Sequence, residues 1–253
     1  MPLLTRDDPA ACTVINAAGR PDLVLVCDHA SYRVPRMLDN LGLTTAQLQD
    51  HIGWDAGAAE LARCLSELLD APLVLANYSR LLIDCNRAPD HPGSIMQTSD
   101  GVHIPGNLAL TPEQRRERRI DLFEPYHQAI AALIKAREPG KPTIVAIHSF
   151  TPVLQGILRP WSIGICSGND RRLSDPLLES LRKTLGTDVG DNQPYSIEQG
   201  VDYTLPYHAG KQDLPHVMLE MSRDQLCTDR HTQQWAQRLA QVLLPGLMQT
   251  LSH

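Results

Sequence analysis

Three apolar runs in the sequence each end in a side chain that can bind a metal or accept a proton. These runs are residues 23–29, 143–148 and 217–220. A continuous apolar run of this length is typical of a strand buried on both faces, as in a parallel sheet. Ligands of such sheets bind at the carboxyl ends of the strands. The sequence therefore predicts that His29, His148 and Glu220 meet at one edge of a sheet.

Other short apolar runs bounded by turn residues complete the predicted sheet. The expected strands are Leu23–Cys27, Leu73–Ala76, 81–84, 143–147, 162–166 and 217–221. Helical patterns separate them, so strands and helices alternate along the chain. This alternation predicts an α/β fold with three layers, α/β/α, around a mixed and mostly parallel sheet.

The expected helices cover residues 56–69, 111–137, Ser174–Leu185 and 229–251. Thr111 and Gln114 form a capping-box pattern with Pro112 in the first turn, which indicates where the second helix begins. Pro245-Gly246 predicts a kink or break near the end of the last helix. Residues 86–110 and 190–215 fit neither pattern, and loops of this length in a compact domain are usually functional.

Length, charge and cysteine content limit the class of protein. The 253 residues, 42% of them apolar, suit one domain spanning residues 1–253. The formal net charge of −6 and the lack of a basic run argue against nucleic acid as a partner. The six cysteines are scattered, and neither a signal peptide nor a membrane-spanning run is evident. We therefore expect a soluble, cytoplasmic protein without disulfides; the sequence does not give its oligomeric state.

Two histidines at matching strand ends favour a metal site. Catalytic zinc is commonly held by two histidines and one acid, with a position left open for water. His29 and His148 would be two of the ligands. Asp55 is one candidate for the third ligand, although its position before a helix also suits an N-cap. His51 and Asp28 remain alternatives for the third position.

Glu220 is the predicted general base. A carboxylate at the end of an apolar strand is costly to bury unless it is paired or used. Beside an activated water it would accept the proton and return it to the leaving nitrogen. A salt bridge with Arg223 is the competing interpretation.

A group of polar side chains predicts how an acidic substrate is held. Asn86 and Arg87 would grip a carboxylate through a planar, bidentate contact. Arg80 or Arg33 would serve a second carboxylate, and an Arg80–Asp84 structural pair is the alternative role for Arg80. His208 and His216 would assist the leaving group, or are ordinary loop histidines.

These segments resemble the N-formylglutamate amidohydrolase family. The residues that carry the resemblance are 27–35, 54–58, 79–87, 104–107, 125–127, 148–150 and 214–220. They extend over most of the chain, from about Leu23 to Leu226.

The resemblance implies a zinc-dependent amide hydrolase with a fold similar to that of zinc carboxypeptidases. It implies that His29, Asp55 and His148 hold zinc and that Glu220 is catalytic. Asn86 and Arg87 resemble the pair with which zinc carboxypeptidases bind a substrate carboxylate. The family's reaction converts N-formyl-L-glutamate and water to formate and L-glutamate, a step of histidine catabolism.

Two departures from related patterns affect the expected substrate. Zinc carboxypeptidases have a glutamate three residues after the first histidine, whereas Tyr32 occupies that position here. Many relatives have an arginine where this chain has Ser222. The alternatives are a zinc deacylase of N-acyl amino acids, a small-peptide carboxypeptidase, a hydrolase without metal, and a carboxylate-binding protein on the same scaffold.

Overall fold

A seven-stranded mixed sheet organises the protein. The computed structural model describes residues 3–250, and side chains to residue 245. The strand order is β1-β3-β2-β6-β11-β9-β10. The strands are β1 (Cys12–Ile15), β2 (Leu23–Cys27), β3 (Leu73–Ala76), β6 (Thr143–Phe150), β9 (Ile163–Cys166), β10 (Val189–Asp191) and β11 (His216–Ser222).

The four central strands are parallel and the edges are mixed. β3, β2, β6 and β11 run in one direction, β1 is antiparallel to β3, and β9 is antiparallel to β11. β10 is parallel to β9. The parallel centre places the carboxyl ends of β2, β6 and β11 at one edge, as the sequence predicted.

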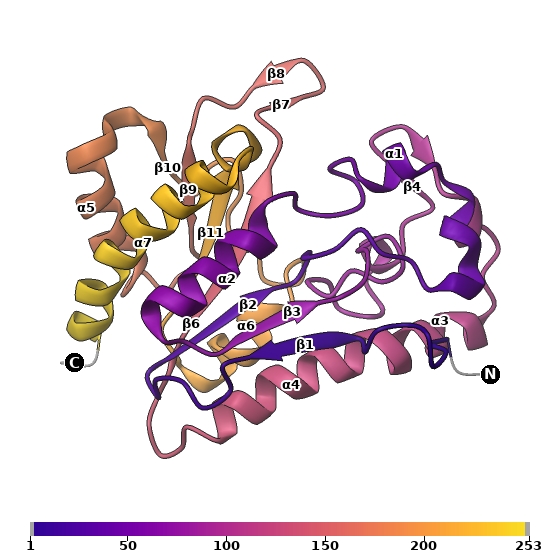
Figure 1. Ribbon diagram of the computed structural model, residues 1–253, viewed down its shortest axis with the longest axis horizontal. Helices are drawn as coiled ribbons and strands as arrows, with labels where there is room; N and C mark the ends of the chain where they lie inside the picture. The colour runs from indigo at the N-terminus through magenta and orange to yellow at the C-terminus, as the bar shows by residue number, and fades with distance from the viewer. Residues whose placement is uncertain (1–2, 251–253) are drawn as a thin grey trace.

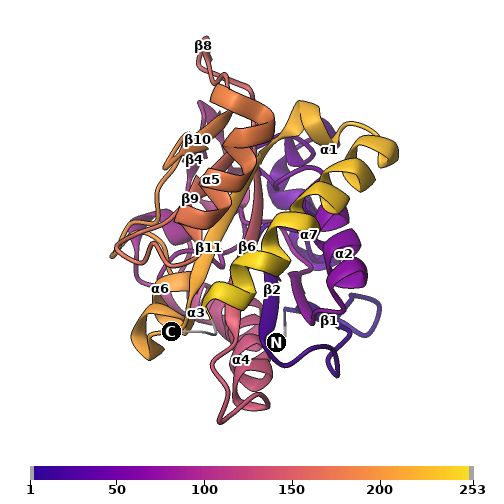
Figure 2. The ribbon, with the colours of Figure 1, turned by 90° about the vertical axis from the view of Figure 1, so that its left-hand side faces the viewer.

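Helices cover both faces of this sheet, so the fold is a three-layer α/β/α sandwich (Figures 1 and 2). Leu23, Leu25 and Cys27 of β2 pack on the side of α2, α5 and α7, whereas Val24 and Val26 pack on the side of α4 and α6. This alternation follows from the two-residue period of a strand. Because both faces are covered, the strands are apolar throughout, which explains the continuous apolar runs in the sequence.

The main helices are α2 (Ala58–Leu69), α3 (Pro112–Arg118), α4 (Glu124–Lys135), α5 (Ser174–Leu185), α6 (Thr204–His208) and α7 (Asp229–Thr250). A short α1 (Thr45–Leu48) precedes them. The Thr111–Gln114 capping box is present at the start of α3. A π-helical turn (Arg119–Phe123) joins α3 to α4, so the predicted single helix is nearly continuous. None of the helices in the described part of the chain has the length and apolar character that a bilayer span requires.

One predicted strand is absent, and of the kink or break predicted at Pro245, a break is excluded. Residues 81–82 form a turn and residues 83–84 have no regular structure, while Leu81, Leu82 and Ile83 are buried in a third apolar cluster outside the sheet. The apolar run thus predicts that these residues are buried, but it does not distinguish a buried strand from a buried turn. The last helix does not break at Pro245 but continues to Thr250. Its predicted final residue, Leu251, lies outside the described residues.

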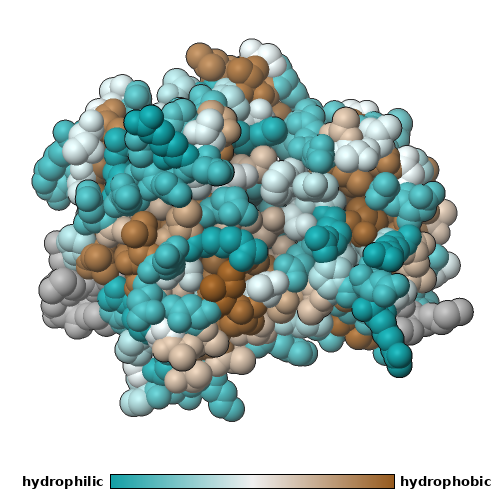
Figure 3. All heavy atoms as spheres, in the orientation of Figure 1, coloured by the Kyte–Doolittle hydropathy of each residue, from teal (hydrophilic) through white to brown (hydrophobic). Residues whose placement is uncertain are grey.

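The two long segments without a predicted structure contain small elements. Residues 86–110 include the hairpin β4 (Thr98–Ser99) and β5 (Val102–His103), and residues 190–215 include α6. A second hairpin, β7 (Val153–Leu154) and β8 (Ile157–Leu158), projects beyond the end of β6 (Figure 1). Its side chains Val153, Ile157 and Leu158 are exposed, and the surface at the top of Figure 3 carries a hydrophobic patch.

Candidate active site

The carboxyl ends of β2, β6 and β11 open into a cavity of about 420 Å³. His148 lies on β6 and Glu220 lies opposite it on β11, in paired register. His29 follows β2 by two residues. The cavity wall includes all three, together with Asp55, Arg80, Asn86, Arg87, Glu198 and Asp202. The convergence predicted from the apolar runs is present.

The loop before α2 brings Asp55 to the two histidines. The Asp55 amide donates to the His29 carbonyl at 3.0 Å, which ties this loop to the end of β2. Gly57 follows with φ +83°, and a Cβ there would meet the Leu226 side chain at 2.6 Å. Only glycine suits both the left-handed backbone and the close contact. Gly57 therefore fixes where α2 begins and where Asp55 points.

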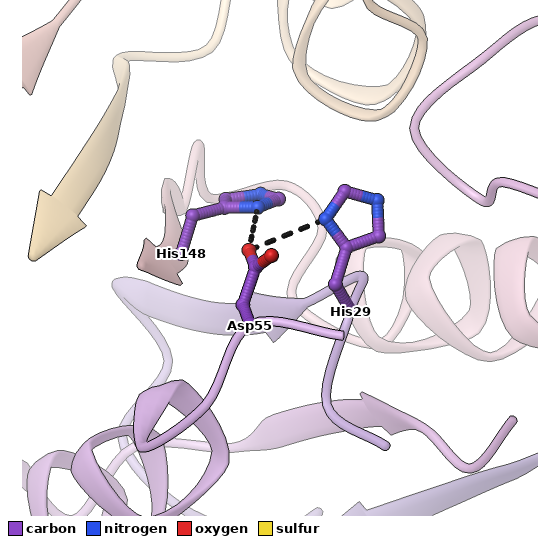
Figure 4. A group of neighbouring side chains, drawn as sticks. All are labelled: His29, Asp55 and His148. Atoms are coloured by element: carbon purple, nitrogen blue, oxygen red, sulfur yellow. Dashed lines mark hydrogen bonds and ion pairs between the residues drawn. The ribbon is translucent and has the colours of Figure 1, made fainter. Parts of the chain in front are cut away.

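His29, Asp55 and His148 form a compact group of potential metal ligands (Figure 4). One oxygen of Asp55, Oδ2, lies 2.9 Å from His148 Nδ1 and 3.3 Å from His29 Nδ1. One ligand atom from each residue lies within 4.8 Å of the others. All three residues are buried, with exposed fractions of 2%, 6% and 2%.

A second layer of carboxylates contacts the far nitrogen of each ring. His29 Nε2 lies 2.8 Å from Asp84 Oδ1, and His148 Nε2 lies 3.0 Å from Asp28 Oδ2. Both nitrogens of each ring face a carboxylate, and carboxylates only accept hydrogen bonds, so these contacts favour the doubly protonated, cationic ring. A metal on the inner side would replace the Nδ1 proton, and Nε2 would keep its proton for the outer carboxylate. Histidines that bind metals have this arrangement, because the outer carboxylate fixes the tautomer and the ring orientation.

The outer carboxylates are themselves held. Arg80 Nη2 donates to Asp84 at 2.6 Å, so the structural pair considered for these two residues is present. Asp28 accepts hydrogen bonds from the Tyr126 hydroxyl at 2.8 Å and the Thr204 hydroxyl at 2.7 Å. Both outer carboxylates, Asp84 and Asp28, are thereby fixed in position.

The protonation preferences of this group show how strongly it attracts positive charge. Burial raises the pKa of Asp28, but hydrogen bonds from His148 and Thr204 outweigh burial and hold it at about 2. Burial lowers the pKa of His148, yet its contacts with Asp28 and Asp55 raise it well above the usual value. The cluster therefore stabilises cationic charge on its inner side, which a metal ion would supply in place of protons.

The alternatives for the third ligand have other partners. Asp28 contacts the outer nitrogen of His148 rather than the inner one. His51 lines the cavity but contacts Asp50 at 3.1 Å and Asp100 at 3.2 Å. Asp55 is the acid that the structure places between the two inner nitrogens.

Glu220 is buried beside this group without a partner for one of its oxygens. Within the described residues, its Oε2 makes no hydrogen bond, and the residue is 5% exposed. Burial raises the pKa of Glu220 to about 7. The suggested salt bridge with Arg223 is absent, because Arg223 contacts Asp50 instead. A buried carboxylate with a free oxygen and a raised pKa is suited to proton transfer.

Gly164 makes room for the backbone carbonyl of Gln193 beside Glu220. It lies opposite Glu220 on the neighbouring strand β9. A Cβ at this position would lie 2.1 Å from the Gln193 carbonyl and 3.4 Å from Glu220 Cβ. A larger residue would therefore push the 193 loop away from the cavity wall.

The Asn86–Arg87 pair lines the cavity, as predicted, but it already binds an acid of the protein. Asp202 Oδ1 accepts from Asn86 Nδ2 at 3.0 Å and from Arg87 Nη1 at 2.8 Å. No sequence pattern connects Asp202, 116 residues after Asn86, with this pair. The same is true of Thr204, which contacts Asp28.

Three predicted site residues lie away from the cavity. Arg33 is exposed and lines a different pocket with Trp54 and Arg63. His208 is buried in α6, where it contacts His127 Nδ1 at 2.9 Å. His216 begins β11, four residues before Glu220, and contacts the Leu214 carbonyl at 2.8 Å. The sequence placed His208 in a loop because the five-residue α6 has no clear helical pattern, and it placed the start of the last strand one residue after His216.

Comparisons with known proteins find similar chains in both sequence and structure. Residues 21–227 match the N-formylglutamate amidohydrolase family. The crystal structure of a gene product from Agrobacterium tumefaciens is similar, with a TM-score of 0.93 and 36% identity over 99% of this chain and 100% of that chain. An N-formylglutamate amidohydrolase from Ralstonia eutropha shares the fold, with a TM-score of 0.64 and 19% identity over 94% of this chain and 100% of that one. Curated protein sequences gave no significant match.

Proposed function

Because the chain belongs to the N-formylglutamate amidohydrolase family, and is therefore an amide hydrolase, we propose that it is a zinc enzyme that hydrolyses the amide bond of small N-acyl amino acids. Hydrolysis of N-formyl-L-glutamate to formate and L-glutamate is the reference reaction. The observation that carries this proposal is the buried His29–Asp55–His148 group with a carboxylate behind each imidazole.

The residues of this group fit zinc. Two imidazole nitrogens and one carboxylate oxygen are a common donor set of catalytic zinc. The inner nitrogens already face a single Asp55 oxygen, and the rings are fixed from behind by Asp84 and Asp28. When bound, zinc would acidify water and polarise the substrate carbonyl.

Glu220 would act as the general base and then as the acid. It neighbours His148 across the β6–β11 pair, and its free Oε2 is available to take a proton from water. The protonated carboxyl would then donate to the leaving nitrogen. Its raised pKa suits both steps near neutral pH, because the group can hold and release a proton there.

The two cavity arginines would serve different groups of the substrate. Arg80 is anchored by Asp84 and lies 3.8 Å from Asp55, so its charge would help stabilise the developing oxyanion. Arg87 would bind the α-carboxylate and thereby orient the amide.

The test combines metal analysis with an assay. Purified protein should contain about one zinc per chain and release formate from N-formyl-L-glutamate or a related N-formyl amino acid. Chelation should abolish turnover, and added zinc should restore it. Full turnover after complete metal removal would instead support a metal-free acid–base hydrolase, and zinc binding without turnover on any N-acyl amino acid or small peptide would support a binding protein.

A further inference from the structure

A carboxylate of the protein occupies part of the predicted substrate-carboxylate site. Asp202 Oδ1 lies 2.8 Å from Arg87 Nη1 and 3.0 Å from Asn86 Nδ2. Arg87 Nη1 also donates to the Asn86 carbonyl at 2.8 Å. Arg87 Nη1 and Asn86 Nδ2 therefore already donate hydrogen bonds to a carboxylate of the protein.

Asp202 is fixed in this position. Its Oδ2 accepts from the Glu198 amide at 2.8 Å, and its own amide donates to the Glu198 carbonyl at 2.9 Å. The next residue, Tyr203, donates its amide to the Asn86 carbonyl at 3.1 Å. The side chain of Asp202 is 11% exposed. Both carboxylate oxygens of Asp202 accept hydrogen bonds, and the backbone amides of Asp202 and Tyr203 are also bonded. Asp202 is therefore a fixed part of the cavity wall.

The amide of Asn86 has little capacity left for a ligand. Its Oδ1 accepts from the backbone amides of Tyr203 and Thr204, both at 3.1 Å, and its Nδ2 donates to Asp202. Arg87 is different, because its Nε and Nη2 make no hydrogen bond to any described residue. A guanidinium edge of two N–H groups fits one carboxylate in a bidentate contact. The pair thus offers one place for one carboxylate.

The rest of the described wall provides one further arginine, which already lies between two acids of the protein. Among the described lining residues, Arg80 is the other arginine, and it contacts Asp84 at 2.6 Å and Asp55 at 3.8 Å. The remaining charged side chains there, Glu198, Asp202 and Glu220, are acids. A second substrate carboxylate would face these acids without a partner, which is unfavourable in a partly desolvated site.

Accepting the proposed function, we propose that the preferred substrate is an N-acyl amino acid with a single carboxylate and an uncharged side chain, and that Asp202 determines this selectivity. Met96, Phe150 and Met218 add apolar surface to the same wall, which suits a neutral side chain. N-formyl-L-glutamine and N-formyl-L-glutamate have nearly the same size and differ in one charge, so they isolate the effect.

The experiment measures binding separately from turnover. The zinc-loaded Glu220→Gln variant is titrated calorimetrically with each of the two compounds, and kcat/KM for both is measured with the wild-type enzyme. Tighter binding of N-formyl-L-glutamine by at least about tenfold, or about 1.4 kcal/mol, is expected. Adding Asp202→Asn should shift the ratio of the two dissociation constants toward glutamate by at least about tenfold, and Asp202→Ala should shift it the same way. Asp213→Asn, which removes an exposed charge outside the cavity, should leave the ratio unchanged.

Each outcome is decisive. Equal or tighter binding of N-formyl-L-glutamate by the Glu220→Gln variant overturns the proposal without any change at residue 202. An unchanged ratio of the two dissociation constants in both folded, zinc-loaded Asp202 variants overturns the role of Asp202. Failure of the Glu220→Gln variant to bind either compound also overturns the proposal. Selective binding with no turnover by the wild type supports the selectivity and contradicts only the proposed hydrolysis.

Discussion

Two pairs of buried histidines lie in this protein, and they differ in what surrounds them. The rings of His29 and His148 have centroids 4.9 Å apart, and those of His127 and His208 are 5.1 Å apart. All four residues are at most 6% exposed. Residue type, burial and spacing are therefore nearly the same in the two pairs.

The partners make the difference. Both rings of the first pair contact carboxylates at each nitrogen. In the second pair, His127 contacts the Cys85 carbonyl at 2.9 Å and the ring of His208 at 2.9 Å, both neutral groups. Burial lowers the pKa of His127 to about 4 and that of His208 to about 3, whereas the pKa of His148 is raised. Carboxylate partners thus distinguish a cation site from a structural contact.

The largest expected effect comes from deleting a ring of the first pair. We expect His148→Ala to lose zinc and to reduce kcat/KM by at least about 10³-fold, since the metal supplies several kcal/mol of transition-state stabilisation. His208→Gln is the matched change in the second pair and should retain about one zinc per chain. Elemental analysis and formate release measure both. Equal zinc loss in the two variants would contradict the distinction.

Glu220→Gln is expected to separate the base from the ligands. Zinc content should remain at the wild-type level, because Glu220 belongs to neither layer of the metal group. Turnover should fall by about 10²- to 10⁴-fold, the usual contribution of a general base. Glu179→Gln removes an exposed acid on α5 and is the control. Wild-type turnover in Glu220→Gln would show that another group takes the proton.

Removing an outer carboxylate should make the first pair more like the second. Asp84→Asn and Asp28→Asn each leave the three inner residues intact but neutralise the acceptor behind one ring. We expect zinc affinity to fall by about 10- to 100-fold in each variant, as is usual for outer partners of metal-bound histidines. Competition with a chelator of known affinity measures the change. Unaltered affinity in both variants would mean that the inner residues alone determine binding.

The sequence predicted those parts of the structure that depend on local pattern. The apolar runs identified β2, β6 and β11 and therefore placed His29, His148 and Glu220 at one edge, because the direction of a parallel strand fixes where its last residue lies. The prediction of a strand at residues 81–84 was wrong because burial alone does not distinguish a strand from a packed turn. Edge strands β1 and β10 were missed because they are short and only partly apolar.

Contacts between distant segments were not predictable in the same way. Asp202 reaches Arg87 across 115 positions of sequence, and Thr204 reaches Asp28 across 176. Neither residue stands in an apolar run or a recognisable motif. His208 was predicted to be in the substrate site because it lies in a long segment without a predicted structure. The sequence contains no signal that shows which residue such a histidine contacts. Only the fold shows that this partner is His127.

The last prediction tests the second pair through stability. The folded-state pKa values of about 4 and 3 lie below the usual value of about 6.5. Between pH 6.5 and 4 the unfolded chain therefore binds more protons, and stability is lost as the pH falls through this range. We expect the free energy of unfolding to drop by up to about 1.4 kcal/mol per pH unit for each histidine.

Urea unfolding from pH 7.5 to 4.5 measures this loss, comparing the wild type with the double variant His127→Asn, His208→Gln. The variant has no titratable group at either position, so its unfolding free energy should fall less steeply with decreasing pH. His103→Gln, which removes an exposed imidazole, should have the wild-type slope. If the double variant also kept the wild-type slope, the two buried rings would not be neutral in the folded protein. The proposed difference in charge between this pair and the carboxylate-bound pair would then be wrong.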